Sequence, residues 1–170
     1  MKPLGEYIIA FEGLKQGTHH FEFEVDNKFF ETFDCFEFNS SAFKVDLELE
    51  KRSTMLLLEF SFTGSFTVPC DRCLDDVEMP LSGAEKLIVK FGSDNYTDTD
   101  DILILPDSEH EINVAANIYE FIMLHVPQKR VHEKGKCNQN VIDALSKVEQ
   151  KEEQHEDPRW ASLKDINLEK

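Results

Sequence analysis

One short segment of the 170-residue chain constrains its fold more than any other. In residues 43–50, with the sequence Phe-Lys-Val-Asp-Leu-Glu-Leu-Glu, apolar and charged residues alternate without interruption. Strict alternation places one row of side chains in a core and the other row in water. This is typical of a strand in an antiparallel sheet that has one solvated face. The segment therefore predicts a fold built around a β-sheet.

Similar patterns before and after this segment extend the predicted sheet over residues 1–105. The sequence favours strands at residues 7–11, 20–25, 43–50, 55–62, 65–68, 85–91 and 102–105, with turns at residues 51–54 and at Gly64. In residues 55–62 the pattern leaves open which of the two alternating sets is buried. The chain has 14 phenylalanines, which indicates an aromatic-rich core. We predict an antiparallel, partly barrel-like sheet.

The hydrophobic period changes after residue 112. Apolar residues from Val114 to Ile122 recur at helical spacing, Asn113 can cap the first turn, and Pro127 cannot continue a helix. This predicts a helix over residues 113–126, with His125 as a packing residue on its apolar face. The phenylalanines of residues 27–33 are spaced for one or two further helical turns. Residues 1–127 are therefore interpreted as one α+β domain with a helix packed on the sheet.

Residues 128–170 contain fewer apolar residues, and we interpret them as a loosely attached tail with short amphipathic helices. One narrow apolar stripe at helical spacing consists of Val141, Ile142, Leu145 and Val148. Asp157 and Pro158 are a favourable helix start just before Trp160. Trp160 is the only tryptophan of the chain. It suits an anchor, either for a partner or for a groove of the protein itself.

The charge of the chain is unevenly distributed. Residues 1–127 hold 9 Lys and Arg against 25 Asp and Glu, so the whole net charge of −16 lies there. Such a body repels phosphate backbones and favours a basic partner. The locally basic run consists of Lys129, Arg130, Lys134 and Lys136, and it is the candidate for contact with RNA. Because no long apolar segment and no signal-peptide pattern is visible, we expect a cytoplasmic protein without a membrane span.

The cysteines carry the most specific chemical signal. Cys70 and Cys73 form a C-x₂-C motif directly after a predicted strand, and His132 and Cys137 follow the predicted helix. Two such pairs supply four ligands of the types that bind tetrahedral Zn²⁺. The site would be structural, since four protein ligands leave no open position for water. A dithiol redox role, or no special role, stays open at this point. Cys35, between phenylalanines, is expected in the core.

Signatures of catalysis are absent from the sequence. We find no Gly-rich phosphate loop, no nucleophile elbow, no H-E-x-x-H motif and no dinucleotide fingerprint. The acidic segment with Asp98, Asp100 and Asp101 lacks the spacing of a calcium loop and is interpreted as a solvated loop. A hydrolase or nuclease that binds Mg²⁺ through Asp98 or Asp100 is a minor alternative. The sequence therefore predicts a protein that is not an enzyme.

Four segments carry a resemblance. They are residues 64–74 with Cys-Asp-Arg-Cys, residues 87–92, residues 117–127 with Asn-Ile-Tyr-Glu-Phe and Leu-His-Val-Pro, and residues 157–164 with Asp-Pro-Arg-Trp-Ala-Ser-Leu-Lys. Together they resemble the YceD family of large ribosomal RNA subunit accumulation proteins. The resemblance implies a bacterial cytosolic factor that supports the accumulation or processing of large-subunit ribosomal RNA, with no known enzymatic activity.

The resemblance also implies which partners to expect. They are large-subunit rRNA, ribosomal proteins or assembly factors, rather than a small-molecule substrate or a membrane. The acidic body fits a companion of basic proteins better than it fits a general RNA binder. The alternative hypothesis is therefore an adaptor that binds a basic partner without direct contact with RNA.

Overall fold

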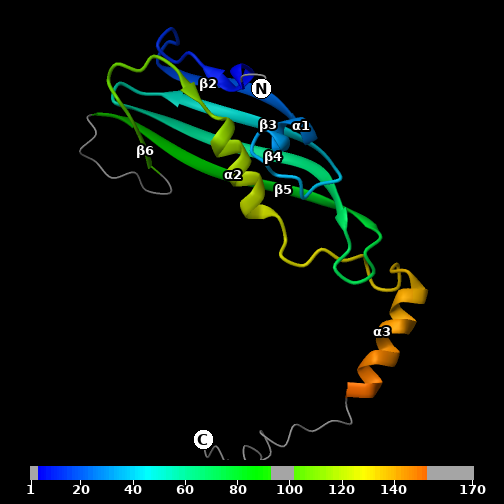
Figure 1. Ribbon diagram of the computed structural model, residues 1–170. Coiled ribbons are helices and arrows are strands. Elements are labelled where there is room, and N and C mark those ends of the chain that lie inside the picture. Colours follow the sequence, from blue (N-terminus) through cyan, green and yellow to red (C-terminus); the bar gives the residue numbers. More distant parts are fainter. Residues whose placement is uncertain (1–3, 93–101, 153–170) are drawn as a thin grey trace, which may run out of the picture.

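A five-stranded sheet forms the centre of the computed structural model, which describes residues 4–92 and 102–152 (Figure 1). The strand order is β2-β3-β4-β5-β6. The strands are β2 (Gly17–Asp26), β3 (Ser40–Lys51), β4 (Met55–Pro69), β5 (Asp76–Phe91) and β6 (Ile102–Leu105). Strands β2 to β5 are antiparallel, whereas β6 runs parallel to β5. A second, smaller antiparallel sheet pairs β1 (Ile8–Ile9) with β7 (Ile112–Asn113).

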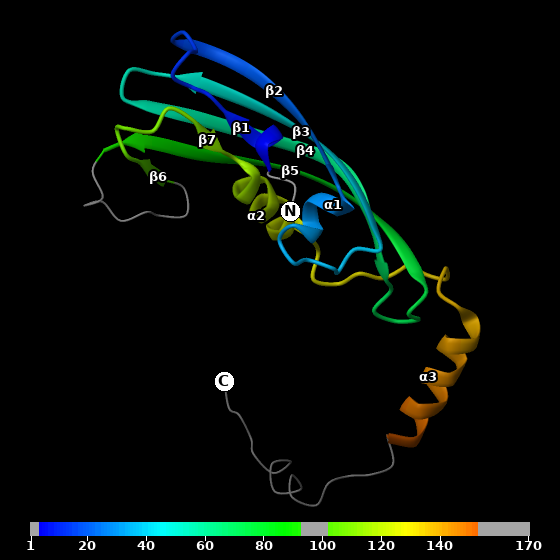
Figure 2. The ribbon, with the colours of Figure 1, turned by 45° about the horizontal axis from the view of Figure 1, so that its top comes forward.

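Helices lie on one face of the large sheet and beyond its end. They are the 3-10 turn η1 (Gly5–Tyr7) and the α-helices α1 (Asn27–Glu31), α2 (Ala115–His125) and α3 (Gln139–Glu152). Helix α2 crosses one face of the sheet, and α3 projects away from the end where β4 turns into β5 (Figures 1 and 2). The structure therefore confirms an α+β fold.

Two side chains start the helices that pack on the sheet. The Asp26 side chain accepts a hydrogen bond from the Phe29 N–H at 3.1 Å, and the Asn113 side chain accepts one from the Ala115 N–H at 2.9 Å. Such bonds satisfy backbone donors that a first helical turn leaves unpaired. Helix α1 buries Phe29 and Phe30, so α2 is not the only helix that packs against the core.

The register of β3 and β4 settles which side chains of β4 are buried. Val45 lies opposite Phe62, Leu47 opposite Phe60, and Leu49 opposite Leu58. All six side chains are buried. Because the two strands share one pleat, the buried row of β3 continues across β4, and the alternating pattern fixes a single register. The opposite row stays in contact with solvent.

Two predictions about the sheet are wrong. The sheet is not partly barrel-like but open, because β2 and β6 are its two edges and do not pair with each other in the described parts of the chain. Gly64 does not turn the chain but lies inside β4, opposite Phe43. A Cβ atom at this position would collide with the Ala42 carbonyl oxygen and with Phe43. Glycine is therefore needed there for close approach of β3.

Helix α2 holds the core together and sets the path of the chain after it. Ile118 and Ile122 are fully buried, and Phe121 packs edge-on against Phe60 with a centroid distance of 5.2 Å. His125, the predicted packing histidine, stacks edge-on against Phe62 at 5.1 Å, and its Nδ1 lies 2.9 Å from the Phe121 carbonyl oxygen. Gly83 of β5 makes room for that ring. After Pro127 the chain runs toward the hairpin between β4 and β5 (Figure 1).

Candidate metal centre

The first half of the candidate site is the tight loop between β4 and β5. The Cys70 N–H donates to the Asp75 carbonyl at 2.9 Å, and the Leu74 N–H donates to the Cys70 carbonyl at 2.9 Å. Leu74 adopts the left-handed conformation, with a φ of 64°. These features curl the loop so that Cys70 and Cys73 are both buried. The C-x₂-C motif therefore forms a compact knuckle at the end of the hairpin.

The second half is the segment of residues 127–138, which lies against this knuckle. The Asp71 N–H donates to the Arg130 carbonyl at 2.8 Å, and the Arg130 N–H donates to Asp71 Oδ2 at 2.6 Å. A turn follows, in which the Lys136 N–H donates to the Glu133 carbonyl and Gly135 has a φ of 87°. This turn returns the chain to the knuckle at Cys137, just before α3 begins.

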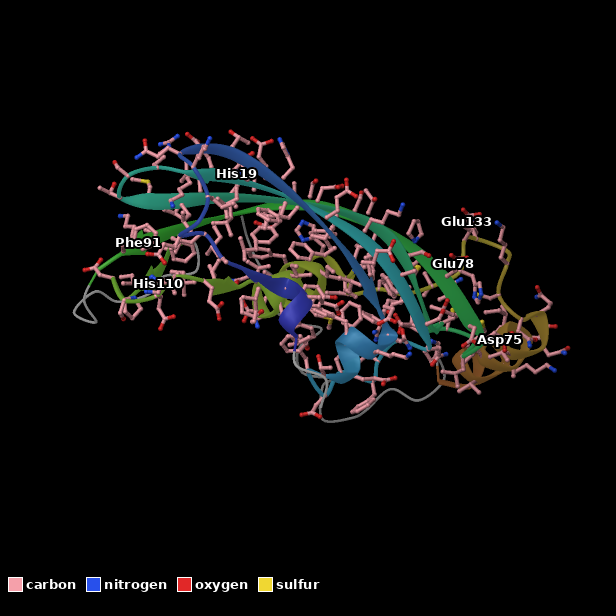
Figure 3. All side chains as sticks on the ribbon, turned by 90° about the horizontal axis from the view of Figure 1, so that it is seen from above. His19, Asp75, Glu78, Phe91, His110 and Glu133 are labelled. Atoms are coloured by element: carbon pink, nitrogen blue, oxygen red, sulfur yellow. The ribbon has the colours of Figure 1, made fainter. Side chains whose placement is uncertain are left out.

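Four side chains converge where these halves meet, and we call them the Cys3His cluster: Cys70, Cys73, His132 and Cys137. Their ligand atoms all lie within 4.8 Å of one another. His132 Nδ1 is 3.4 Å from Cys73 Sγ and 4.0 Å from Cys137 Sγ. Figure 3 shows the labelled neighbours Asp75 and Glu133 at this same end of the molecule. The arrangement is compatible with a metal site.

The ring of His132 is oriented as a metal ligand would be. Its Nε2 lies 3.1 Å from the Asp76 carbonyl oxygen, a group that can only accept a hydrogen bond. The proton of the neutral ring therefore belongs on Nε2, and the lone pair of Nδ1 faces the three sulfurs. Histidine ligands of metals generally donate their other ring N–H to a carbonyl or carboxylate in this way.

The electrostatics of the sulfurs point in the same direction. Burial raises the pKa of Cys70, but backbone N–H groups of Cys73, Arg72 and His132 and the His132 ring outweigh it and lower that pKa to about 6. The pKa of Cys137 is raised by burial and by the neighbouring Cys70 and Cys73. Clustered thiolates repel one another unless a cation lies between them. The donor set thus suits a thiophilic divalent metal such as zinc.

A comparison with known proteins shows to which family the chain belongs. The family model described as large ribosomal RNA subunit accumulation protein YceD matches residues 58–167. The chain belongs to the YceD family. The matched residues include the whole Cys3His cluster. This YceD family chain is also similar to the uncharacterized protein YlbN of Bacillus subtilis (strain 168), with 26% identity over 130 residues, 74% of each chain. No solved structure matches it.

The basic run lies beside the cluster, but its members differ in exposure and in whether they pair with acidic side chains. Lys129 and Lys134 are exposed. Lys136 is paired with Glu133 at 2.8 Å. Arg130 is half-buried, with Nη1 3.1 Å from Glu37 Oε2 and Nε 3.9 Å from Asp71 Oδ1. Arg130 thus joins three segments of the protein, which leaves less of its guanidinium for a ligand.

Some residues of the YceD family chain that matter here could not be found from sequence motifs. The Asp76 carbonyl orients His132, yet a backbone group leaves no residue signal. Asp71 connects the two halves of the site, and only its place inside the C-x₂-C motif could have indicated this. Cys35 is buried in the core as expected. Trp160 and the acidic residues Asp98, Asp100 and Asp101 lie outside the described residues.

The structure describes helices within residues 4–92 and 102–152. None of the helices found there has the length and apolar character needed to span a bilayer.

Proposed function

We propose that this YceD family protein is a non-enzymatic, cytoplasmic factor that supports the accumulation or processing of large-subunit ribosomal RNA. The observation that carries the proposal is the family match over residues 58–167. The printed family description names large-subunit rRNA accumulation and no chemical reaction. That description supports large-subunit rRNA, ribosomal proteins or assembly factors as the proposed partners.

The Cys3His cluster then has a structural role in this proposal. Cys70, Cys73, His132 and Cys137 would hold Zn²⁺ with four protein ligands, which leaves no position for a catalytic water. Zinc bound there would join the β4–β5 hairpin to the segment leading into α3. Metal sites of this kind contribute directly to the free energy of folding. The clamp would keep the basic run beside the hairpin.

Contact with RNA is assigned to that basic run. Lys129, Arg130, Lys134 and Lys136 lie on the segment that leads through His132 to Cys137, and Lys129 and Lys134 are exposed. The remainder of the chain is acidic, so phosphate contacts elsewhere are unfavourable. Lys129 and Lys134 are the first choices for crosslinking, because Arg130 and Lys136 already have acidic partners. Trp160 is proposed as the anchor for a protein partner.

The experiment that tests this function is depletion of the protein in its host, followed by the ratio of large- to small-subunit rRNA and a subunit profile. We expect the large-subunit species alone to fall and wild-type protein to restore it. A Cys73→Ser variant should restore it poorly, whereas the matched Cys35→Ala variant, outside the cluster, should restore it well. An unchanged ratio would contradict the proposal and favour an adaptor that binds a basic partner without RNA.

A further inference from the structure

Strand β2 is one edge of the five-stranded sheet. It is 10 residues long and pairs with β3 along its full length, from Gly17 opposite Lys51 to Asp26 opposite Ala42. Within residues 4–92 and 102–152, no strand pairs with its outer side (Figures 1 and 2). Near one end, the Tyr7 hydroxyl donates to the Glu24 carbonyl at 3.0 Å. A long edge of this kind is a template on which another extended chain can add.

The face of β2 on the α2 side is incompletely buried. Phe21 and Phe23 pack against the core but remain half-buried, and Phe23 stacks on Tyr7 with a centroid distance of 5.4 Å. Their partners on β3, Leu47 and Val45, are 1% and 2% exposed. The side chains of β3 are less exposed than those of β2 because β3 has a neighbouring strand on both sides. A further strand beside β2 would remove the remaining apolar surface of both rings from water.

The opposite face of the same edge is acidic. Glu22 and Glu24 are exposed; Glu22 lies directly opposite Asp46 on β3, whereas Glu24 lies opposite Lys44. Like charges in direct cross-strand pairs destabilise a sheet. Glu22 and Asp46 line a hollow of about 410 Å³, together with the short side chains of Ser61 and Ala84. Lys86 also lines it, but its ammonium is paired with Glu59 at 2.6 Å. In the described residues, neither Glu22 nor Asp46 has an ion-pair partner. A cation placed there would relieve the repulsion.

These charges select among the chains that could add to the edge. A second copy would bring its own Glu22 and Glu24 to the same edge, so a pairing that placed these residues opposite one another would be repulsive. Nucleic acid would meet repulsion. We propose that the outer side of β2 binds an extended segment of a partner protein in which Lys or Arg alternates with apolar residues. The basic side chains would face Glu22, Glu24 and Asp46, while the apolar ones would cover Phe21 and Phe23.

The test uses the full chain and an amidated peptide of five Lys-Val repeats that carries fluorescein on its N-terminus. Its affinity is measured by fluorescence anisotropy, and the exchange of backbone amides in β2 is followed with and without peptide. The double variant Glu22→Lys with Glu24→Lys should bind about tenfold more weakly, since two exposed attractive pairs become repulsive. The matched control, Glu111→Lys with Glu120→Lys, makes the same change in net charge away from β2 and should differ by less than about twofold.

We expect the peptide to slow exchange in residues 18–24. The β2 variant should keep a melting temperature close to that of the wild type, because the lysine that replaces Glu22 would lie opposite Asp46, whereas the one that replaces Glu24 would lie opposite Lys44. Equal weakening in both double variants would overturn the proposal, since net charge alone would then explain binding. Unchanged exchange in β2 would also overturn it. Protection of β2 that grows with protein concentration, without peptide, would identify a second copy as the occupant instead. The assay needs no rRNA readout, so its failure is separable from failure of the proposed function.

Discussion

The hydrogen bond between His132 Nε2 and the Asp76 carbonyl determines which ring nitrogen faces the three sulfurs with a free lone pair. With its proton held on Nε2, the ring presents the Nδ1 lone pair, and no rotation is needed before a metal is bound. A site prepared in this way loses little conformational freedom on binding. Each of the four ligands should therefore matter both for metal content and for stability.

We expect Cys73→Ser to abolish stoichiometric zinc and to lower the melting temperature by roughly 5–10 °C, because metal binding is coupled to folding. The measurement is metal analysis of purified protein together with thermal unfolding. Cys35→Ala is the control, since Cys35 is also buried but lies outside the cluster. Equal zinc content in the two variants would show that the Cys3His cluster does not bind the metal.

Tyr7 gives a second prediction at the scale of one residue. Burial, with help from Glu6 and Asp26, raises its pKa from 10.0 to about 12. Between these values the unfolded chain releases the proton while the folded chain keeps it, so stability is intact below pH 10 and falls as the pH rises toward 12. Tyr7→Phe should cost about 0.5–1.5 kcal/mol at neutral pH, through loss of the bond to Glu24.

The difference in unfolding free energy between the wild type and Tyr7→Phe should shrink when urea unfolding is repeated at a pH between 10 and about 12. The reason is that only the wild type carries the titrating hydroxyl of Tyr7. A difference between the two proteins that stays constant with pH would contradict the assignment.

At the scale of elements, the periodicity of the sequence predicted individual strands, but it did not reveal how those strands pair. The alternation in residues 43–50 predicts β3, because a strand with one solvated face can be recognised from its own residues, without knowledge of its neighbours. The buried set of β4 depends on the register with β3. The start of β5 at Asp76 was hidden because Pro80 and Gly83, which usually interrupt strands, both lie inside it. The parallel pairing of β6 with the preceding strand β5 is a tertiary contact, and no short pattern encodes it.

Gly64 tests this interpretation directly. Because a Cβ atom there meets backbone and ring atoms of β3, we expect Gly64→Ala to destabilise the protein by about 1–3 kcal/mol. Chemical unfolding measures the effect, and Gly13→Ala is the control, since no heavy atom lies within 4 Å of the corresponding position. Equal stability of the two variants would mean that β3 and β4 can separate at Gly64 without cost.

At the scale of the whole molecule, ligand chemistry indicated the members of the cluster, and the fold explains how they meet. The spacing of the two pairs and the helix before His132 were visible in the sequence. How α2 directs the chain to the β4–β5 hairpin was not visible, because that path depends on packing against β4 and β5. The contacts of Asp71, Asp76 and Arg130 depend on the same path, so they could not be predicted either.

Because of this path, a metal bound at the Cys3His cluster would connect distant parts of the chain. In the described residues, the knuckle and residues 127–138 are also joined by the bonds of Asp71 with Arg130, and by two side-chain hydrogen bonds: Arg72 Nη1 donates to Cys137 Sγ at 3.6 Å, and Asn138 Nδ2 donates to Asp75 Oδ2 at 3.2 Å. We therefore expect a zinc chelator to accelerate amide exchange in residues 70–75 and 128–138. Strands β2 and β3 should be unaffected, because their core contacts do not involve the cluster.

The Asp71→Asn variant separates the contribution of the hydrogen bonds from that of the metal. Loss of the carboxylate charge weakens the bond that Oδ2 accepts from the Arg130 N–H, so exchange at Arg130 should rise while zinc stays bound. Chelation should then add a further increase across residues 128–138. Chelation that leaves the exchange of these residues unchanged would show that hydrogen bonds alone hold the segment, and that the cluster does not clamp it to the sheet.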